Sequence, residues 1–134
     1  MPPITNATNN PIETNPKSIF DIHERIYLLV LRILKLIRIT PKTPENLVII
    51  QQLSRSITSM GANDQEADGT DTRRDFIHTY VIVRKESKET KYWIRLIGDL
   101  NTGLKIETDE LICEIQEIVN IVSAIIRKSS IKLK

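Results

Sequence analysis

The stretch DELICEIQEIVNIVSAII, residues 109–126, carries the clearest structural signal in this chain of 134 residues. Its main apolar residues recur at steps of four, three, four and three: Leu111, Ile115, Ile118, Val122 and Ile125. This spacing places them along one side of an α-helix and is typical of helices that interdigitate with a neighbour. With Thr108 as the N-cap, the pattern predicts a helix over residues 109–128.

Three earlier segments show the same helical period. A first helix is predicted over residues 19–39, ending before Pro41, because proline disfavours helical geometry in the residue before it. A second is predicted over residues 45–68, with Gly69 as its stop, and a third over residues 71–97. None of the segments alternates apolar and polar residues at period two, so the strand alternative is disfavoured despite the many Ile and Val residues.

Four helices with short connections predict an all-α fold, most simply an antiparallel up-down-up-down four-helix bundle over residues 18–129. Residues 1–17 hold four of the six prolines and little charge, which predicts a disordered N-terminal tail. Residues 130–134 are interpreted as a basic C-terminal tail.

Composition excludes several classes of protein. The longest apolar run is too short to span a bilayer, and no signal peptide is recognisable, so we expect a cytoplasmic protein without membrane contact. The single cysteine, Cys113, cannot form an internal disulfide and is expected to be a small buried hydrophobe. No metal-ligand, phosphate-loop or nucleophile motif is present, and His23 and His78 are interpreted as structural, so we expect no catalytic residues, metal or cofactor.

The first and fourth helices are more apolar than one core requires. Of residues 18–40, 14 of 23 are apolar, and of residues 109–126, 11 of 18. A helix facing a single core needs about three in seven. We therefore expect a homo-oligomer whose contacts use the outer faces of these two helices. The alternative is that Arg and Lys stems cover the excess.

The formal net charge of +2 conceals local basic patterns. One stripe on the third helix steps by four, three and four positions: Arg84, Lys88, Lys91 and Arg95. Such a stripe suits successive phosphates of RNA or DNA, but an ordinary solvated face compensated by neighbouring glutamates explains it equally well. The C-terminal basic cluster comprises Arg127, Lys128, Lys132 and Lys134, and it alternatively complements the negative end of the fourth helix.

Several residues are predicted to hold the helices together. Gly61 lies among small residues and predicts a close approach of another backbone. Asn63 and Glu66 share a helix face, and we expect them to form a hydrogen-bonding pair that locks the second helix to the third. Antiparallel pairing of these helices predicts a salt bridge between Arg55 and Glu86.

Trp93 has two interpretations. A tryptophan on a helix can stack on an unpaired base. A single Trp on a bundle helix is more often part of the core or of an interface, and we favour that interpretation.

The second and third helices carry short motifs that resemble the bacterial four-helix bundle protein family, the proteins encoded in intervening sequences of 23S rRNA genes and their chromosomal relatives. The motifs are QLSRS at 52–56, SMGAN at 59–63, EA at 66–67, DFIH at 75–78, RKESKE at 84–89 and YWIRL at 92–96. The similarity covers roughly residues 18–129. It implies a cytosolic bundle that forms a ring-like homopentamer with no established enzymatic activity. The family is similar in architecture to the accessory protein of diversity-generating retroelements, a basic pentamer that binds nucleic acid and a reverse transcriptase; this chain is far less basic.

Two functional hypotheses remain from the sequence. The first is a non-enzymatic, homo-oligomeric scaffold that contacts RNA or DNA through its basic stripes. The second is a protein–protein interaction module, such as a reverse-transcriptase accessory protein, whose basic residues serve solubility and make no direct contact with nucleic acid.

Overall fold

The computed structural model describes residues 19–133, which form four α-helices and one short 3₁₀ helix and contain no strand. The elements in chain order are α2 (Ile19–Ile39), α3 (Pro44–Ala67), α4 (Arg73–Leu100), η1 (Thr102–Leu104) and α5 (Lys105–Leu133). The all-α class is therefore confirmed for this part of the chain. The tail predicted over residues 1–17 lies outside the described residues.

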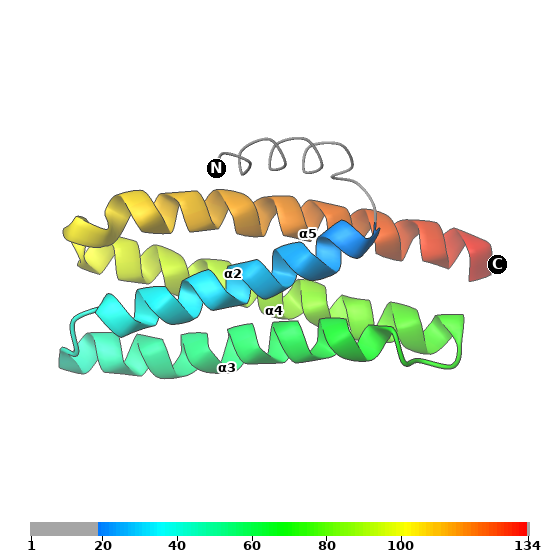
Figure 1. Ribbon diagram of the computed structural model, residues 1–134, viewed down its shortest axis with the longest axis horizontal. Coiled ribbons are helices and arrows are strands. Elements are labelled where there is room, and N and C mark those ends of the chain that lie inside the picture. Colours follow the sequence, from blue (N-terminus) through cyan, green and yellow to red (C-terminus); the bar gives the residue numbers. More distant parts are fainter. Residues whose placement is uncertain (1–18, 134) are drawn as a thin grey trace, which may run out of the picture.

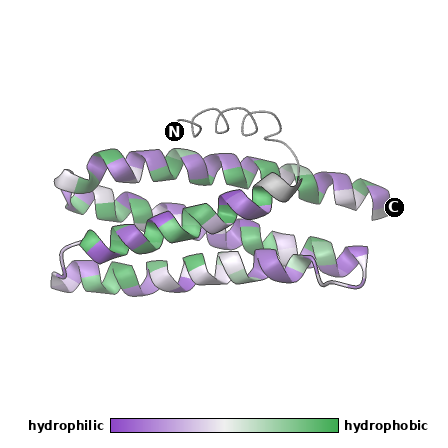
Figure 2. Cartoon of the chain, in the orientation of Figure 1, coloured by the Kyte–Doolittle hydropathy of each residue, from purple (hydrophilic) through white to green (hydrophobic). Residues whose placement is uncertain are grey.

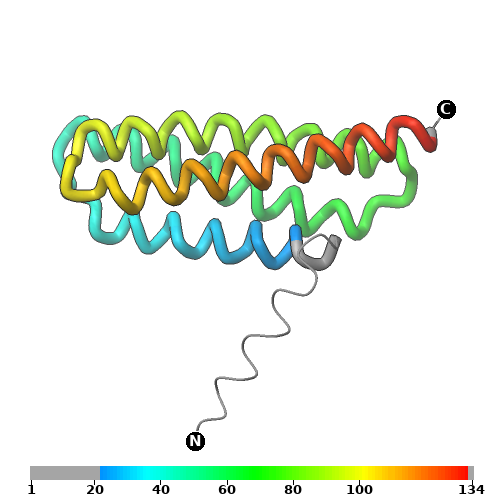
Figure 3. The backbone as a smooth tube through the Cα atoms, turned by 90° about the horizontal axis from the view of Figure 1, so that it is seen from above, coloured from blue at the N-terminus to red at the C-terminus, as the bar shows by residue number. Residues whose placement is uncertain are grey.

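The four α-helices lie side by side and successive helices run in opposite directions (Figures 1 and 3). Helix α4 packs against α3 on one side and α5 on the other, whereas α2 contacts these two helices more sparsely and does not approach α4. The sequence-based arrangement, up-down-up-down, matches this path of the chain. Helix α2 consequently lies diagonally opposite α4, with one broad face pointing outward.

Hydroxyl caps explain where two of the helices begin. The Thr43 side chain accepts a hydrogen bond from the Asn46 amide at 3.2 Å, and Pro44 occupies the first position of α3. Thr72 caps α4 in the same way, accepting from the Asp75 amide at 3.0 Å. These bonds satisfy amide groups that have no partner within the helix, so both starts lie within two residues of the predicted positions.

Helix α5 is longer at both ends than predicted. It begins at Lys105, directly after the 3₁₀ turn, and Thr108 is a buried residue of its first turn that bonds back to the Lys105 carbonyl at 3.0 Å. At the other end the helix continues to Leu133, so residues 130–133 form a helical turn and the prediction of a tail there is wrong for them.

The end of α4 also differs from the prediction of residue 97, because the helix continues past Gly98 to Leu100. A Cβ atom at position 98 would overlap the Thr108 hydroxyl and lie 3.0 Å from the Thr108 Cβ atom. Gly98 is therefore required for the close approach of α4 and α5, and it does not end a helix.

The core between the helices is almost entirely aliphatic. In α5, Leu111, Ile115, Ile118 and Val122 are buried as predicted, whereas Ile126 is more deeply buried than the expected Ile125. In α3 the line of buried residues begins with Asn46 and Ile49. Asn46 donates to the Pro41 carbonyl and to Asn101 Oδ1, each at 2.9 Å, which explains how an amide is accommodated there.

Candidate functional site

The predicted basic stripe on α4 is divided by the fold. Arg84 and Lys91 are half-buried against α5, where Arg84 donates to Ser123 Oγ at 3.4 Å and Lys91 to the Gln116 side-chain carbonyl. Lys88 is exposed, and Arg95 is exposed with only a long contact, 3.9 Å, to Asp99. Only two of the four cations therefore extend freely into solvent from this helix.

A larger group of cations gathers where α5 ends. Arg127 and Lys128 are both exposed there. Because α4 and α5 are antiparallel, the beginning of α4 lies beside this end and adds the exposed Arg73 and Arg74. Sequence analysis missed these two residues, because their proximity to residue 127 depends on how the chain folds back.

The predicted salt bridge between α3 and α4 is present. Arg55 contacts Glu86 at 3.4 Å and also bridges to Glu89. Glu89 in turn accepts a hydrogen bond from the Trp93 indole at 3.0 Å. The Trp93 hydrogen bond and the Arg55 charge both stabilise the carboxylate, so they lower the pKa of Glu89. Trp93 packs against the core, in agreement with the structural interpretation.

Gly61 is closely packed, but against a side chain and not against the backbone that was expected. A Cβ atom there would lie 3.3 Å from Val30 Cγ2 of α2. The prediction for Asn63 and Glu66 is wrong: Asn63 donates to the Ser59 carbonyl of its own helix at 2.8 Å, and Glu66 is exposed.

Asp64, adjacent to Asn63, provides the link that was expected of that pair. His23 Nδ1 of α2 lies 3.0 and 2.9 Å from the two carboxylate oxygens of Asp64, and the Tyr80 hydroxyl of α4 donates to the same carboxylate at 2.9 Å. Asp64 and Tyr80 are fully buried. Burial and the nearby Asp64 charge both raise the pKa of Tyr80, so the phenol remains a hydrogen-bond donor.

This buried cluster, His23, Asp64 and Tyr80, connects three helices. His23 Nε2 also lies 3.3 Å from Asp68 at the end of α3. Residues 19–133 contain no group of three or more His, Cys, Asp or Glu side chains placed to hold a metal ion. The cluster therefore acts as a polar tie within the bundle. Asp64 was missed because one carboxylate in a polar stretch resembles a surface residue.

Cys113 corrects another expectation, since it is exposed on α5 and is not a buried hydrophobe. The middle of α5 also departs from the prediction, although Ile106 and Ile131 near its two ends are exposed. Its surplus apolar residues, Ile112, Ile121 and Ile125, pack partly against the core, and the exposed positions between them are mostly polar. The predicted second apolar face is consequently absent from this portion of α5.

Helix α2 does carry such a face. Tyr27, Leu28, Leu31 and Leu34 are exposed along it, and Figure 2 shows hydrophobic residues on the side of α2 that faces the viewer. Beside Tyr27 a groove of about 470 Å³ runs between α2 and α3, floored by Gly61 and Ala62. Within residues 19–133, every helix lacks the stretch of uncharged apolar sequence that a membrane crossing requires.

Comparisons with known proteins agree with the earlier resemblance. The family model described as 23S rRNA-intervening sequence protein matches residues 20–124. A crystal structure of a protein of unknown function from the S23 ribosomal protein family of Bacteroides thetaiotaomicron VPI-5482 is 28% identical, with a TM-score of 0.72. The alignment covers 79% of this chain and 95% of that one. None of the curated proteins matches the chain. The protein belongs to the 23S rRNA-intervening sequence protein family.

Proposed function

We propose that this protein is a non-enzymatic scaffold that assembles with copies of itself into a ring and presents basic residues to RNA or DNA. The exposed apolar face of α2, made of Tyr27, Leu28, Leu31 and Leu34, is the observation that carries the proposal. Burying one such side chain contributes about 1.5–3 kcal/mol, so a contiguous row supplies a substantial part of an interface.

A second copy of the chain is the occupant that we propose for this face. The first 18 residues, MPPITNATNNPIETNPKS, are a poor alternative, because they are rich in Pro, Asn and Thr and offer few large apolar side chains. The groove floored by Gly61 and Ala62 adjoins the face and provides space for an apolar side chain of the neighbouring copy. Contact between two different surfaces of identical chains closes into a ring when the rotation permits. The family resemblance favours five copies.

The nucleic-acid part of the proposal rests on cations that have few internal partners. Lys88 and Arg95 on α4 and Arg127 and Lys128 on α5 are exposed, and a symmetric ring repeats them in every subunit. Repeated cations at fixed spacing neutralise several phosphates at once, which raises affinity for a strand of any sequence.

One observation favours the second candidate, a protein-binding module such as a reverse-transcriptase accessory protein. Arg84 and Lys91 bond to α5, so half of the predicted stripe already has a structural partner. In this alternative the apolar groove beside α2 receives a partner protein and the cations serve solubility.

Light scattering coupled to size exclusion tests the assembly. We expect the wild-type protein to elute as a particle of five times the 15.4 kDa chain mass. Leu31→Asp should dissociate it. Val81→Asp is the matched control, since Val81 is exposed to a similar extent, 38% against 37%, but lies on α4, diagonally opposite α2. A monomeric wild type at tens of micromolar, or an assembly that survives Leu31→Asp, would refute the α2 interface.

A salt series tests the nucleic-acid contact. The logarithm of the binding constant for single-stranded RNA or DNA should fall linearly with the logarithm of salt concentration. The slope of this salt dependence should decrease in each of two double variants, Lys88→Gln with Arg95→Gln and Arg127→Gln with Lys128→Gln. Lys105→Gln is the control for the Arg127 and Lys128 pair: it removes a charge at the other end of α5, where Lys105 pairs with Asp99, and should change the slope less. Absence of binding at about 50 mM salt would support the protein-binding module instead.

A further inference from the structure

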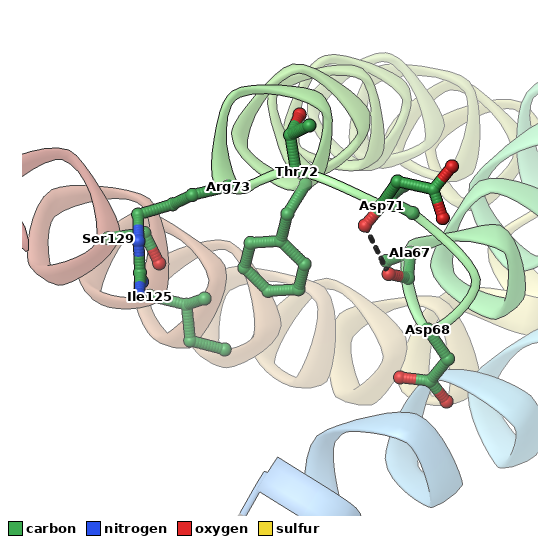
Figure 4. Close-up of a pocket in the computed structure, with 9 residues that line it drawn as sticks. Ala67, Asp68, Asp71, Thr72, Arg73, Ile125 and Ser129 are labelled. Carbon is green, nitrogen blue, oxygen red and sulfur yellow. Dashed lines mark hydrogen bonds between the residues drawn. The ribbon is translucent and has the colours of Figure 1, made fainter. Parts of the chain in front are cut away.

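A pocket of about 480 Å³ lies between the α3–α4 turn and the C-terminal part of α5 (Figure 4). The turn and the start of α4 contribute most of its lining, and α5 contributes Ile125 and Ser129. The pocket lies beside the cations at the end of α5. The chemistry of its lining therefore indicates which kind of ligand the pocket and those cations bind together.

One part of the pocket is apolar. Phe76 and Ile125 line it, and both are partly buried against the core. The ring of Phe76 is supported by Tyr80, whose ring centroid lies 4.9 Å away. A supported aromatic ring beside an aliphatic side chain forms a surface on which a flat base can pack, and base–aromatic stacking tolerates every base.

The polar part of the pocket is formed by Ser129 and Arg73. Ser129 is only 9% exposed and lines the pocket. Among the described residues no buried polar side-chain atom lacks a hydrogen-bond partner, so the Ser129 hydroxyl is not an unsatisfied buried group. Arg73 is exposed, and Figure 4 shows its side chain extending from α4 across to Ser129 and Ile125. A hydroxyl and an adjacent guanidinium in the pocket wall suit a ligand with oxygen acceptors.

The charges around the pocket favour phosphate at its mouth. Lys128 and Lys132 follow Ile125 by three and seven positions, so they lie on the same side of α5 as the pocket lining. Two carboxylates also line the pocket. Asp68 points toward α2 in Figure 4, where His23 contacts it at 3.3 Å, and Asp71 lies at the turn. The two aspartates repel a free anion such as inorganic phosphate. A free anion also has no apolar part that could pack against Phe76 and Ile125.

We propose that this pocket binds one unpaired nucleotide of a single strand, with the base against Phe76 and Ile125 and the phosphate at Arg73, Lys128 and Lys132. Ser129 donates a hydrogen bond to an acceptor of the nucleotide. The inference rests on the proposed nucleic-acid contact and deepens it, because it moves the principal site from the middle of α4 to the end of the bundle.

Methyl NMR on the full-length protein with labelled isoleucine tests the pocket directly. Adenosine 5′-monophosphate should shift the Ile125 methyl signal saturably. Inorganic phosphate and adenosine alone should each bind at least tenfold more weakly, because each offers half of the ligand. Arg73→Gln should weaken nucleotide binding about tenfold, the usual effect of one charge-assisted contact. Lys105→Gln is the control and should leave it unchanged. Ser129→Leu should abolish binding by filling the pocket, with circular dichroism to confirm folding.

The outcomes separate this inference from the broader proposal. If phosphate shifts Ile125 as strongly as the nucleotide does, or if Arg73→Gln has no effect, the nucleotide pocket is refuted. If long strands bind with salt-dependent affinity but the mononucleotide leaves Ile125 unshifted, the pocket is refuted and the scaffold proposal stands. If the mononucleotide binds and long strands do not, the pocket is a site for free nucleotides, and both its assignment to a single strand and the contact of the scaffold with strands are refuted.

Discussion

His23 Nδ1 of α2 lies 2.9 Å from Asp64 Oδ2 of α3, and this contact joins two helices across a comparatively sparse interface. The Tyr80 hydroxyl of α4 donates a hydrogen bond to the same carboxylate. Asp64 is thus a buried charge with partners from two other helices, which orients α2 about its own axis.

Asp64→Ala should lower the free energy of unfolding by about 3 kcal/mol, because it removes both hydrogen bonds and leaves His23 and Tyr80 without their shared acceptor. Urea denaturation monitored by circular dichroism measures the loss. Asp68→Ala is the matched control: this carboxylate also contacts His23 but is 69% exposed, so its removal should cost less than about 1 kcal/mol. Equal losses in the two variants would show that the buried tie has no special role.

Gly98→Ala should destabilise the bundle by about 1–3 kcal/mol, because the new Cβ overlaps the Thr108 hydroxyl and forces α4 and α5 apart. Gly103→Ala provides the comparison, since a Cβ there meets nothing within 4 Å. Thermal unfolding of both variants checks the prediction. If Gly98→Ala is as stable as Gly103→Ala, the two helices do not depend on a glycine for their contact.

Arg25 should stabilise the contact between α2 and α5 more than Arg32 does. Arg25 donates to both oxygens of Glu114 at 3.0 and 2.7 Å, and these bonds raise its pKa, so it stays charged. The Arg25 side chain is 24% exposed, whereas that of Arg32, which pairs with Glu107 and Glu110, is 42% exposed.

We therefore expect Arg25→Gln to cost about 1–2 kcal/mol and Arg32→Gln less than about 1 kcal/mol. A double-mutant cycle of Arg25→Gln with Glu114→Gln isolates the pairwise coupling. A coupling energy near zero would contradict the role assigned to this pair.

Trp93→Phe should raise the pKa of Glu89 toward its ordinary value, because the indole hydrogen bond is the largest influence that lowers it. A carboxyl whose pKa is lower in the folded state adds stability above its unfolded pKa, and that contribution is lost as the pH falls through the folded pKa. The contribution of Glu89 to the difference in unfolding free energy between variant and wild type should therefore disappear as the pH falls below the folded-state pKa of Glu89. NMR titration of the Glu89 carboxyl carbon measures the shift directly.

Asp99 serves as the internal control in the same titration. Lys105 holds the pKa of Asp99 below its ordinary value through a hydrogen bond at 2.9 Å, and Trp93 is not among the causes of that shift. The pKa of Asp99 should consequently be the same in Trp93→Phe and wild type. A Glu89 pKa that does not move would mean that the indole contributes nothing to its ionisation.

The agreement between sequence and structure is best where the signal is local. The predicted bounds of the first helix, residues 19–39, match α2, and the starts of α3 and α4 lie within two residues of their predicted positions. Capping hydroxyls and prolines act within a few residues, so they can be recognised without knowing the fold. The error at the start of α5 arose because Thr108 resembles a cap but packs against Gly98 of another helix.

The periodic apolar residues thus specify, before any folding, that this chain forms four helices with inward-facing seams, since helical spacing requires only local geometry. Helical spacing does not determine which polar residues lie inside the bundle. Asp64 became internal, Glu66 stayed in water, and Arg73 came to lie beside Ser129 because the helices adopted a particular rotation and axial register. Those two quantities follow from the packing of whole helix faces, so the buried tie and the pocket exist only once the four helices have assembled.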